Sequence, residues 1–234
     1  MRTVLLANNR LGARIATYLA RRGELDALVL HPVERRSAAE QFEPIDAAIA
    51  RHTWPDGLDA ISADPPECVL SVLFAYKVPP VWLAVPTWRA LNLHPGLLPW
   101  NRGAAPNVWP LVDGSPAGTT LHVMEEAIDT GAILSQVEVP TFPDDTAFTL
   151  YQRLEDASYE MFAEVWPTVA SRAGTPQPPG GTSHRLADLA SLDLTEGDVA
   201  TLDKLRARTF ARFGAEFERD GRRYTARVEI EPLD

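Results

Sequence analysis

Residues 2–30 alternate between strand and helix patterns, and this alternation limits the possible fold more than any other feature of the chain. An apolar β run over residues 2–7 is followed by a helical pattern over 11–22 and a strand pattern over 25–30. A strand, a helix and a second strand in this order predict a parallel pair joined by a right-handed crossover. The first loop lacks G-x-G-x-x-G, which argues against a bound dinucleotide.

Three polar residues, Asn8, Asn9 and Arg10, stand between the first strand and the first helix. Ligands of open α/β sheets bind at the carboxyl ends of strands, where this loop would lie. Asparagine is also a favoured helix cap. The sequence leaves both interpretations open, a ligand contact and a cap.

The same alternation continues along the chain. Apolar patterns predict strands over residues 68–74, 89–93, 119–124 and 132–139, and helices over 37–49, 106–112 and 146–170. We therefore expect an α/β fold: an open, Rossmann-like, mostly parallel sheet with helices on both faces.

Two strand ends and one turn carry the most reactive side chains. Asn92 and His94 are two residues apart, so they point to the same face of an extended strand. Asp129 opens an Asp-Thr-Gly turn after the strand predicted over 119–124. These positions predict that an amide, an imidazole and a carboxylate meet at one rim of the sheet. Taken alone, Asn92 could instead serve strand-end hydrogen bonding, His94 could be a core histidine, and Asp129 could simply form the turn.

Composition excludes several other classes. The net charge of −10 argues against nucleic acid as a main partner, since binding to phosphate backbones depends on clustered Lys and Arg. The single cysteine, Cys68, lies in an apolar run and is interpreted as a buried hydrophobe. The start has too short an apolar core for a secretory signal, and no run reaches the ~20 apolar residues of a membrane span. We expect a cytoplasmic protein without a metal site.

Four separate blocks carry a family resemblance. They are N-x-H-P-G-L-L-P from Asn92, R-G-A-A-P from Arg102, G-x-T-L-H-x-M from Gly118 and I-D-x-G-A-I-L from Ile128. In this order they resemble the formyltransferases that use 10-formyltetrahydrofolate. These include methionyl-tRNA formyltransferase, glycinamide ribonucleotide formyltransferase and the sugar N-formyltransferases.

The resemblance implies a catalytic role for Asn92, His94 and Asp129. An amine attacks the formyl carbon, and the site must hold the resulting oxyanion and move protons. Asn92 and His94 would donate to the oxyanion, while Asp129 would orient His94 or accept the amine proton. His122, in the third block, is expected to be buried and hydrogen-bonded rather than catalytic.

The resemblance also implies two loops around the co-substrate. Tyr76 and Val78 would line the folate pocket, and Ala127 and Ile128 would meet the pteridine. Lys77, in the first of these loops, could meet an acceptor phosphate or simply be solvated.

Further residues are candidates for the acceptor side. Arg102 could bind an acceptor phosphate or brace its own loop. Arg10, Asn8 and Asn9 complete the predicted substrate-binding set.

The end of the chain predicts a small extra unit. A Pro/Gly-rich linker over 173–183 would separate a catalytic domain over 1–172 from a unit over 184–234. A helix is expected from a capping pattern at Thr195 through Thr209, followed by a hairpin of residues 215–219 and 222–230 around an Asp-Gly turn. So small a hairpin must pack on the main body or on a second subunit, and we expect a homodimer.

The resemblance is strongest to compact sugar N-formyltransferases. We therefore expect transfer of a formyl group from 10-formyltetrahydrofolate to the amine of a nucleotide-linked amino sugar. Two enzyme alternatives are a formyltransferase for a free amine of a natural product and an enzyme like methionyl-tRNA formyltransferase. The short tail and the acidic charge of the whole chain disfavour the second of these. A folate-binding regulatory relic is the alternative without catalysis.

Overall fold

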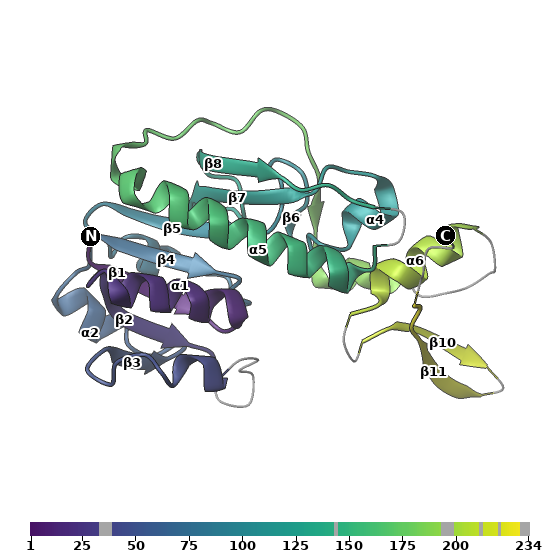
Figure 1. Cartoon of the computed structure of the whole chain (residues 1–234), viewed down its shortest axis with the longest axis horizontal. Helices are drawn as coiled ribbons and strands as arrows, with labels where there is room; N and C mark the ends of the chain where they lie inside the picture. The colour runs from purple at the N-terminus through teal and green to yellow at the C-terminus, as the bar shows by residue number, and fades with distance from the viewer. Residues whose placement is uncertain (33–38, 143–144, 193–198, 211–212, 220, 230–234) are drawn as a thin grey trace. The chain divides into compact units, whose positions relative to one another are not determined.

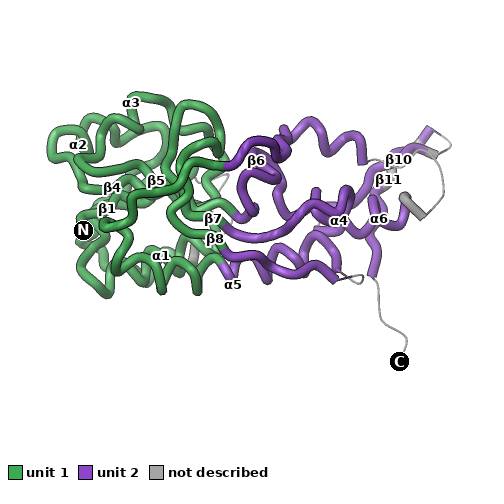
Figure 2. The backbone as a smooth tube through the Cα atoms, turned by 90° about the horizontal axis from the view of Figure 1, so that it is seen from above, with its two compact units in different colours: residues 1–94, 120–136, 158–177 green, residues 95–119, 137–157, 178–234 purple. Residues whose placement is uncertain are grey.

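The computed structural model covers all 234 residues, and the residues described here are 1–32, 39–142, 145–192, 199–210, 213–219 and 221–229. The chain divides into two compact units, coloured separately in Figure 2. Unit 1 comprises Met1–His94, Thr120–Gln136 and Ser158–Gln177, and unit 2 comprises Pro95–Thr119, Val137–Ala157 and Pro178–Asp234. The chain therefore passes between the units several times.

The main sheet has seven strands in the order β3-β2-β1-β4-β5-β7-β8 (Figure 1). Their bounds are β1 Thr3–Ala7, β2 Leu25–Leu30, β3 Ala50–Thr53, β4 Cys68–Val72, β5 Arg89–His94, β7 Gly118–Val123 and β8 Ile133–Glu138. The pairs from β3 to β5 are parallel, and β7 runs antiparallel to β5. The predicted α/β class with a mostly parallel, Rossmann-like sheet is confirmed.

Alternate residues of the strands fill two separate cores in unit 1. One core joins Leu5 of β1 to Leu11 of α1 (Arg10–Arg21) and to Phe162 of α5 (Ala147–Val165). The other joins Val4 of β1 to Ile61 of α2 (Leu58–Ala63) and to residues around α3 (Pro80–Leu83). Because Val4 and Leu5 point to opposite faces of the strand, helices cover both faces of the sheet, as predicted.

Unit 2 contains several further elements, most of them short, and the end of the chain. They are β6 Arg102–Gly103, α4 Trp109–Asp113, β9 Ser183–His184, α6 Val199–Arg208, β10 Ala215–Arg219 and β11 Arg222–Ala226. β6 pairs with β9 in parallel, and β10 with β11 antiparallel. The predicted C-terminal helix and hairpin are present, although β11 ends at Ala226. The expected helix start at Thr195, the turn residue Asp220 and the strand end at Ile230 lie outside the described residues.

The helix predicted over 37–49 is wrong in its described part. Only a 3₁₀ turn, Ala39–Phe42, forms there, and turns follow it. Pro44 explains the difference, because proline lacks the N–H that a helix interior needs. Ser37 lies outside the described residues. The helix predicted over 146–170 likewise ends at Val165 and continues as the 3₁₀ helix Trp166–Ser171, which has Pro167 in its first turn.

Among the residues that the structure describes, no helix is both long and apolar enough to cross a membrane. Cys68 is fully buried in β4, and this burial raises the pKa of its thiol far above the ordinary range. The thiol therefore stays protonated and behaves as a small hydrophobe, as expected from the sequence.

Candidate active site

The strand β5 sets the orientation of the first two predicted site residues. Its residue Asn92 pairs with Ser71 of β4 on one side and with His122 of β7 on the other. His94 lies two residues further along and pairs with Thr120. Because strand residues two apart share a face, Asn92 and His94 point to the same side of the sheet. His94 is only 5% exposed, so its ring is held within unit 1.

Asp129 reaches these residues from the loop between β7 and β8. Its Oδ1 accepts a hydrogen bond of 3.1 Å from Asn92 Nδ2, and its Oδ2 lies 3.5 Å from His94 Nδ1. The three predicted catalytic side chains are therefore brought together at the carboxyl end of β5. The strand end and the turn predicted this convergence, while the catalytic role was implied by the family resemblance.

The turn that carries Asp129 has a demanding backbone. Asp129 has φ +55°, in the left-handed region that aspartate tolerates better than most residues. At Gly131, a Cβ atom would stand 2.0 Å from the carbonyl oxygen of Val123, so only glycine fits. The Asp-Thr-Gly sequence thus meets a steric requirement as well as supplying a carboxylate.

His122 forms a fourth part of the arrangement. It is 1% exposed, and its Nε2 lies 3.2 Å from Asn92 Nδ2 and 3.4 Å from Asp129 Oδ1. Its Nδ1 lies 2.8 Å from the carbonyl oxygen of Val123, which can only accept. Nδ1 therefore carries a proton, and in the neutral ring Nε2 accepts from Asn92. The expectation of a buried, hydrogen-bonded histidine is confirmed, and its partners include Asn92 and Asp129.

The first predicted folate loop borders an aromatic cluster. Tyr76 stacks on Trp54 with ring centroids 5.9 Å apart and meets the edge of His31 at 4.8 Å. The N–H of Ala75 donates to His31 Nε2 at 3.3 Å. Val78 is buried in the same core, so a folate contact from this residue would come from its backbone. His31 lies outside the four motif blocks, so the sequence did not indicate its contacts with this loop.

The second predicted folate loop is open to solvent. Ala127 and Ile128 are both exposed, and Ile128 keeps 53% of its surface accessible. An isoleucine so exposed, next in sequence to Asp129, suits contact with a planar apolar ring.

The residues predicted for the acceptor side differ in their exposure and in their hydrogen-bond partners. Asn9 caps α1, since its side chain accepts from the Gly12 N–H at 2.9 Å, and it also donates to the Leu73 carbonyl at 3.2 Å. Arg10 and Lys77 are exposed, and Asn8 is half-buried. Arg102 belongs to unit 2, where its guanidinium donates to the Gly180 carbonyl at 3.4 Å. The cap interpretation thus holds for Asn9, and Arg102 does brace its loop.

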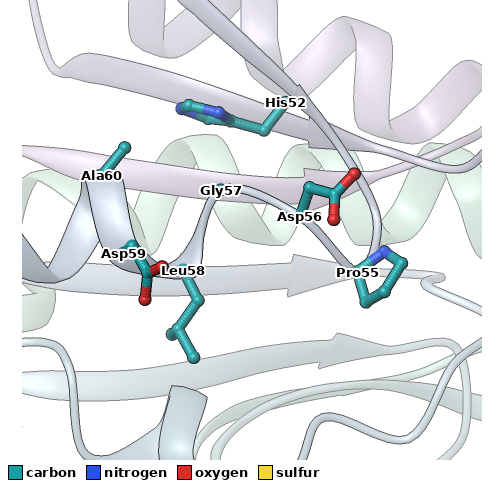
Figure 3. Close-up of a pocket in the computed structure, with 7 residues that line it drawn as sticks. All are labelled: His52, Pro55, Asp56, Gly57, Leu58, Asp59 and Ala60. Atoms are coloured by element: carbon teal, nitrogen blue, oxygen red, sulfur yellow. The ribbon is translucent and has the colours of Figure 1, made fainter.

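A surface pocket opens elsewhere in unit 1 (Figure 3). It is lined by His52 of β3 and by residues at the start of α2: Pro55, Asp56, Gly57, Leu58, Asp59 and Ala60. None of these belongs to the predicted site. Within the described ranges, no group of three or more His, Cys, Asp or Glu is arranged to hold a metal ion.

Several solved structures that are similar to this chain are formyltransferases. The chain superposes on a sugar N-formyltransferase from a Shewanella species with a TM-score of 0.85, at 24% identity over 100% of this chain and 99% of that one. A 4-N formyltransferase from Francisella tularensis gives 0.82, at 21% identity over 99% and 98%. At this identity these likenesses concern the fold.

A third structure is more similar in sequence. The chain is 30% identical to a formyltransferase from Anoxybacillus kamchatkensis, solved with UDP-4,6-dideoxy-4-formamido-L-AltNAc and tetrahydrofolate, with a TM-score of 0.64 over 88% of this chain and 98% of that one. Residues 30–166, more than half of the chain, also match the family model described as formyl transferase. The chain therefore belongs to the formyl transferase family.

Proposed function

We propose that this protein is an N-formyltransferase that moves a formyl group from 10-formyltetrahydrofolate to the amine of a nucleotide-linked amino sugar. The observation that carries the proposal is the convergence of Asn92 and His94 on the Asp129 carboxylate, at 3.1 Å and 3.5 Å. The Anoxybacillus enzyme, which resembles this chain, holds a formylated UDP-sugar and tetrahydrofolate, and this supports the choice of both substrates.

The geometry suits direct attack by a neutral amine. As the amine bonds to the formyl carbon, the carbonyl oxygen becomes an oxyanion that requires hydrogen-bond donors. Asn92 supplies an amide N–H, and His94 can supply a ring N–H. Asp129 takes up the amine proton, directly or through water. As the oxyanion collapses, the bond between the formyl carbon and the folate nitrogen breaks, and this proton passes to the folate nitrogen, which leaves as an amine.

A covalent enzyme intermediate is not needed in this reaction. The obvious candidate nucleophile, Cys68, is buried within β4, and its thiol stays protonated. The residues gathered at the carboxyl end of β5 are an amide, two imidazoles and a carboxylate. Such a set donates hydrogen bonds and moves protons, as amine formylation requires.

The remaining predicted residues fit roles around this centre. We assign Ile128 and Ala127 to the pteridine side, together with the backbone of Val78 and the ring of Tyr76. We assign Lys77 to an acceptor phosphate, because it is exposed and carried by the loop after β4. The proposal places the enzyme in the cytoplasm as a homodimer.

The experiment is a formylation assay with a panel of acceptors. The purified protein is incubated with 10-formyltetrahydrofolate and with nucleotide-linked 3-, 4- and 6-amino sugars, matched free amino sugars and simple natural-product amines. A formyl mass gain on one nucleotide-linked sugar, absent with the matching free sugar, is the expected result. Formylation of the free amines alone would favour the natural-product alternative, and folate binding without any transfer would favour a regulatory relic.

A further inference from the structure

The segment after α5 runs along the beginning of β8, although the sequence marks part of it as a linker. Thr175 forms a two-way backbone bridge with Ile133, with both N···O distances 2.8 Å. Arg172 donates from its guanidinium to the Leu134 carbonyl at 3.2 Å. A Cβ atom on Gly174 would stand 3.2 Å from Ala132 Cβ, so the backbone itself packs closely here. The segment is thus a fixed part of unit 1.

This segment ends in Gln177, whose amide spans the catalytic turn. Gln177 Nε2 donates to the Asp129 carbonyl at 2.8 Å and to the Gly131 carbonyl at 2.9 Å. An amide nitrogen has two hydrogens, and here each can serve one carbonyl. One side chain therefore fixes the direction of the two peptide planes that follow Asp129 and Gly131.

Those peptide planes determine where the Asp129 carboxylate lies. The residue is in the left-handed region, with φ +55°, and its side chain must reach Asn92 at 3.1 Å and His94 at 3.5 Å. A turn held only by its own backbone could relax toward commoner conformations and would carry the carboxylate away. Gln177 opposes that relaxation from outside the turn, through its bonds to the two carbonyl oxygens.

We propose that Gln177 is a positioning residue for formyl transfer, which holds the Asp129 turn so that the carboxylate meets Asn92 and His94. The proposal rests on the catalytic role of Asp129 proposed above. Because displacement of a catalytic group by about 1 Å can cost roughly 10²-fold in rate, loss of both hydrogen bonds should lower kcat by roughly 10- to 100-fold. KM for either substrate should change little, since Gln177 contacts no ligand in this scheme.

The test compares variants of the full chain with the acceptor that gives transfer. Gln177→Leu removes both donors at similar volume, and Gln177→Glu places a carboxylate against two carbonyl oxygens. Thr175→Val is the matched control, because its exposed side chain lies in the same segment while its backbone forms the bridge. We expect reduced kcat at nearly constant KM for both Gln177 variants, and normal kinetics for the control.

A double-mutant cycle separates positioning from general stability. In an Asp129→Asn background, Gln177→Leu should lower kcat by no more than about twofold, since the carboxylate it positions is gone. An undiminished effect in that background would overturn the proposal, as would normal kcat in Gln177→Leu itself. Loss of the folded state in both Gln177 variants, seen by circular dichroism, would likewise assign the residue to stability alone. Full activity of Asp129→Asn would instead refute the role proposed for Asp129.

Discussion

The Asn92 amide has two hydrogens, and both have acceptors in this site. One points to Asp129 Oδ1 at 3.1 Å and the other to His122 Nε2 at 3.2 Å. An oxyanion can therefore bind only by displacing one of them. In the reaction proposed above, the bond to Asp129 is the one that weakens, because a carboxylate that takes up the amine proton becomes a poorer acceptor. His122 then keeps the amide oriented while Asn92 turns its freed N–H to the oxyanion.

Replacement of Asn92 tests this account directly. Asn92→Ala should lower kcat by about 10²–10³-fold, the usual cost of one preorganised oxyanion donor, and should change KM for the folate much less. His94→Asn should be at least as damaging, since it also removes a titrating group. The measurement is single-turnover formylation, in which chemistry limits the rate. Gln152→Ala, an exposed amide on α5, is the control. Near wild-type turnover in Asn92→Ala would remove the oxyanion role.

Lys77 tests the assignment of the acceptor. Lys77→Ala should raise KM for the nucleotide sugar severalfold and leave KM for the folate unchanged, the mark of lost acceptor binding. Because Lys77 is exposed, its attraction for a phosphate is screened, so the difference should shrink as salt rises. Lys204→Ala on α6 serves as a control of equal charge change. An unchanged acceptor KM in Lys77→Ala would weaken the nucleotide-sugar assignment and favour an unphosphorylated amine.

At the scale of elements, the sequence is informative where apolar residues are continuous. β2 was predicted at its observed bounds, Leu25–Leu30, because nearly all of its residues are buried. β3, Ala50–Thr53, was missed because it is a polar edge strand with three exposed residues out of four and therefore lacks a hydrophobic pattern. β4 stops at Val72, before the predicted end at Phe74, because Leu73 adopts φ +48° and cannot continue a strand.

The start of α5 depends on one buried carboxylate. Asp145 is 3% exposed and accepts from the Phe142 N–H at 2.7 Å, from Thr149 Oγ1 at 2.8 Å and from Arg153 Nη2 at 2.6 Å. Burial alone would raise the pKa of this carboxyl, but the hydrogen bonds from Arg153, Phe142 and Thr149 outweigh it and hold the pKa below its usual value. The charged form therefore stabilises the fold above the unfolded pKa of about 3.9, and this contribution is lost as the pH falls through the folded pKa.

Asp145→Asn should lower the free energy of unfolding by about 2–3 kcal/mol near neutral pH, because it weakens hydrogen bonds to a charged group. The difference from the wild type should become smaller at an acidic pH below the unfolded pKa, as the wild-type carboxyl takes up a proton. Urea denaturation at both pH values measures it. Glu160→Gln, at an exposed position on the same helix, should have little effect at either pH. A difference independent of pH would contradict the charge-based explanation.

For the whole molecule, the sequence indicated the residues whose side chains suit the proposed reaction. It did not indicate Gln177, whose proposed role depends on where the fold places it. Asn92, His94 and Asp129 stand in motif blocks and at strand ends or turns, so their convergence could be predicted. Gln177 meets Asp129 across 48 residues of sequence and sits in a Pro/Gly-rich stretch that resembles a linker. No periodicity indicates such a contact, because it depends on the path of the chain after α5.

The C-terminal part of unit 2 combines a small hairpin with exposed apolar residues. A two-stranded hairpin such as β10–β11 is marginally stable by itself. Nearby in the sequence, Phe213 and Leu202 keep 58% and 47% of their surfaces exposed. Tyr224 and Ile230, which the sequence placed on the same hairpin face, have side chains outside the described residues. Val228 is half-buried, and its N–H donates to Thr209 Oγ1 at 3.0 Å.

We expect the C-terminal part of unit 2 to join two copies of the chain, since a hairpin this small needs further packing and exposed apolar residues favour association. Sedimentation velocity at about 1–50 μM, the range in which moderately tight dimers form, should show a homodimer. Phe213→Glu and Leu202→Glu should each raise the dimer dissociation constant by about tenfold or more, because a charge would be buried in an apolar contact. Val81→Glu is the control: Val81 is 55% exposed but belongs to α3 in unit 1. A monomer throughout this range, or equal weakening by the control, would show that the hairpin region does not pair subunits, and its apolar residues would then need another explanation.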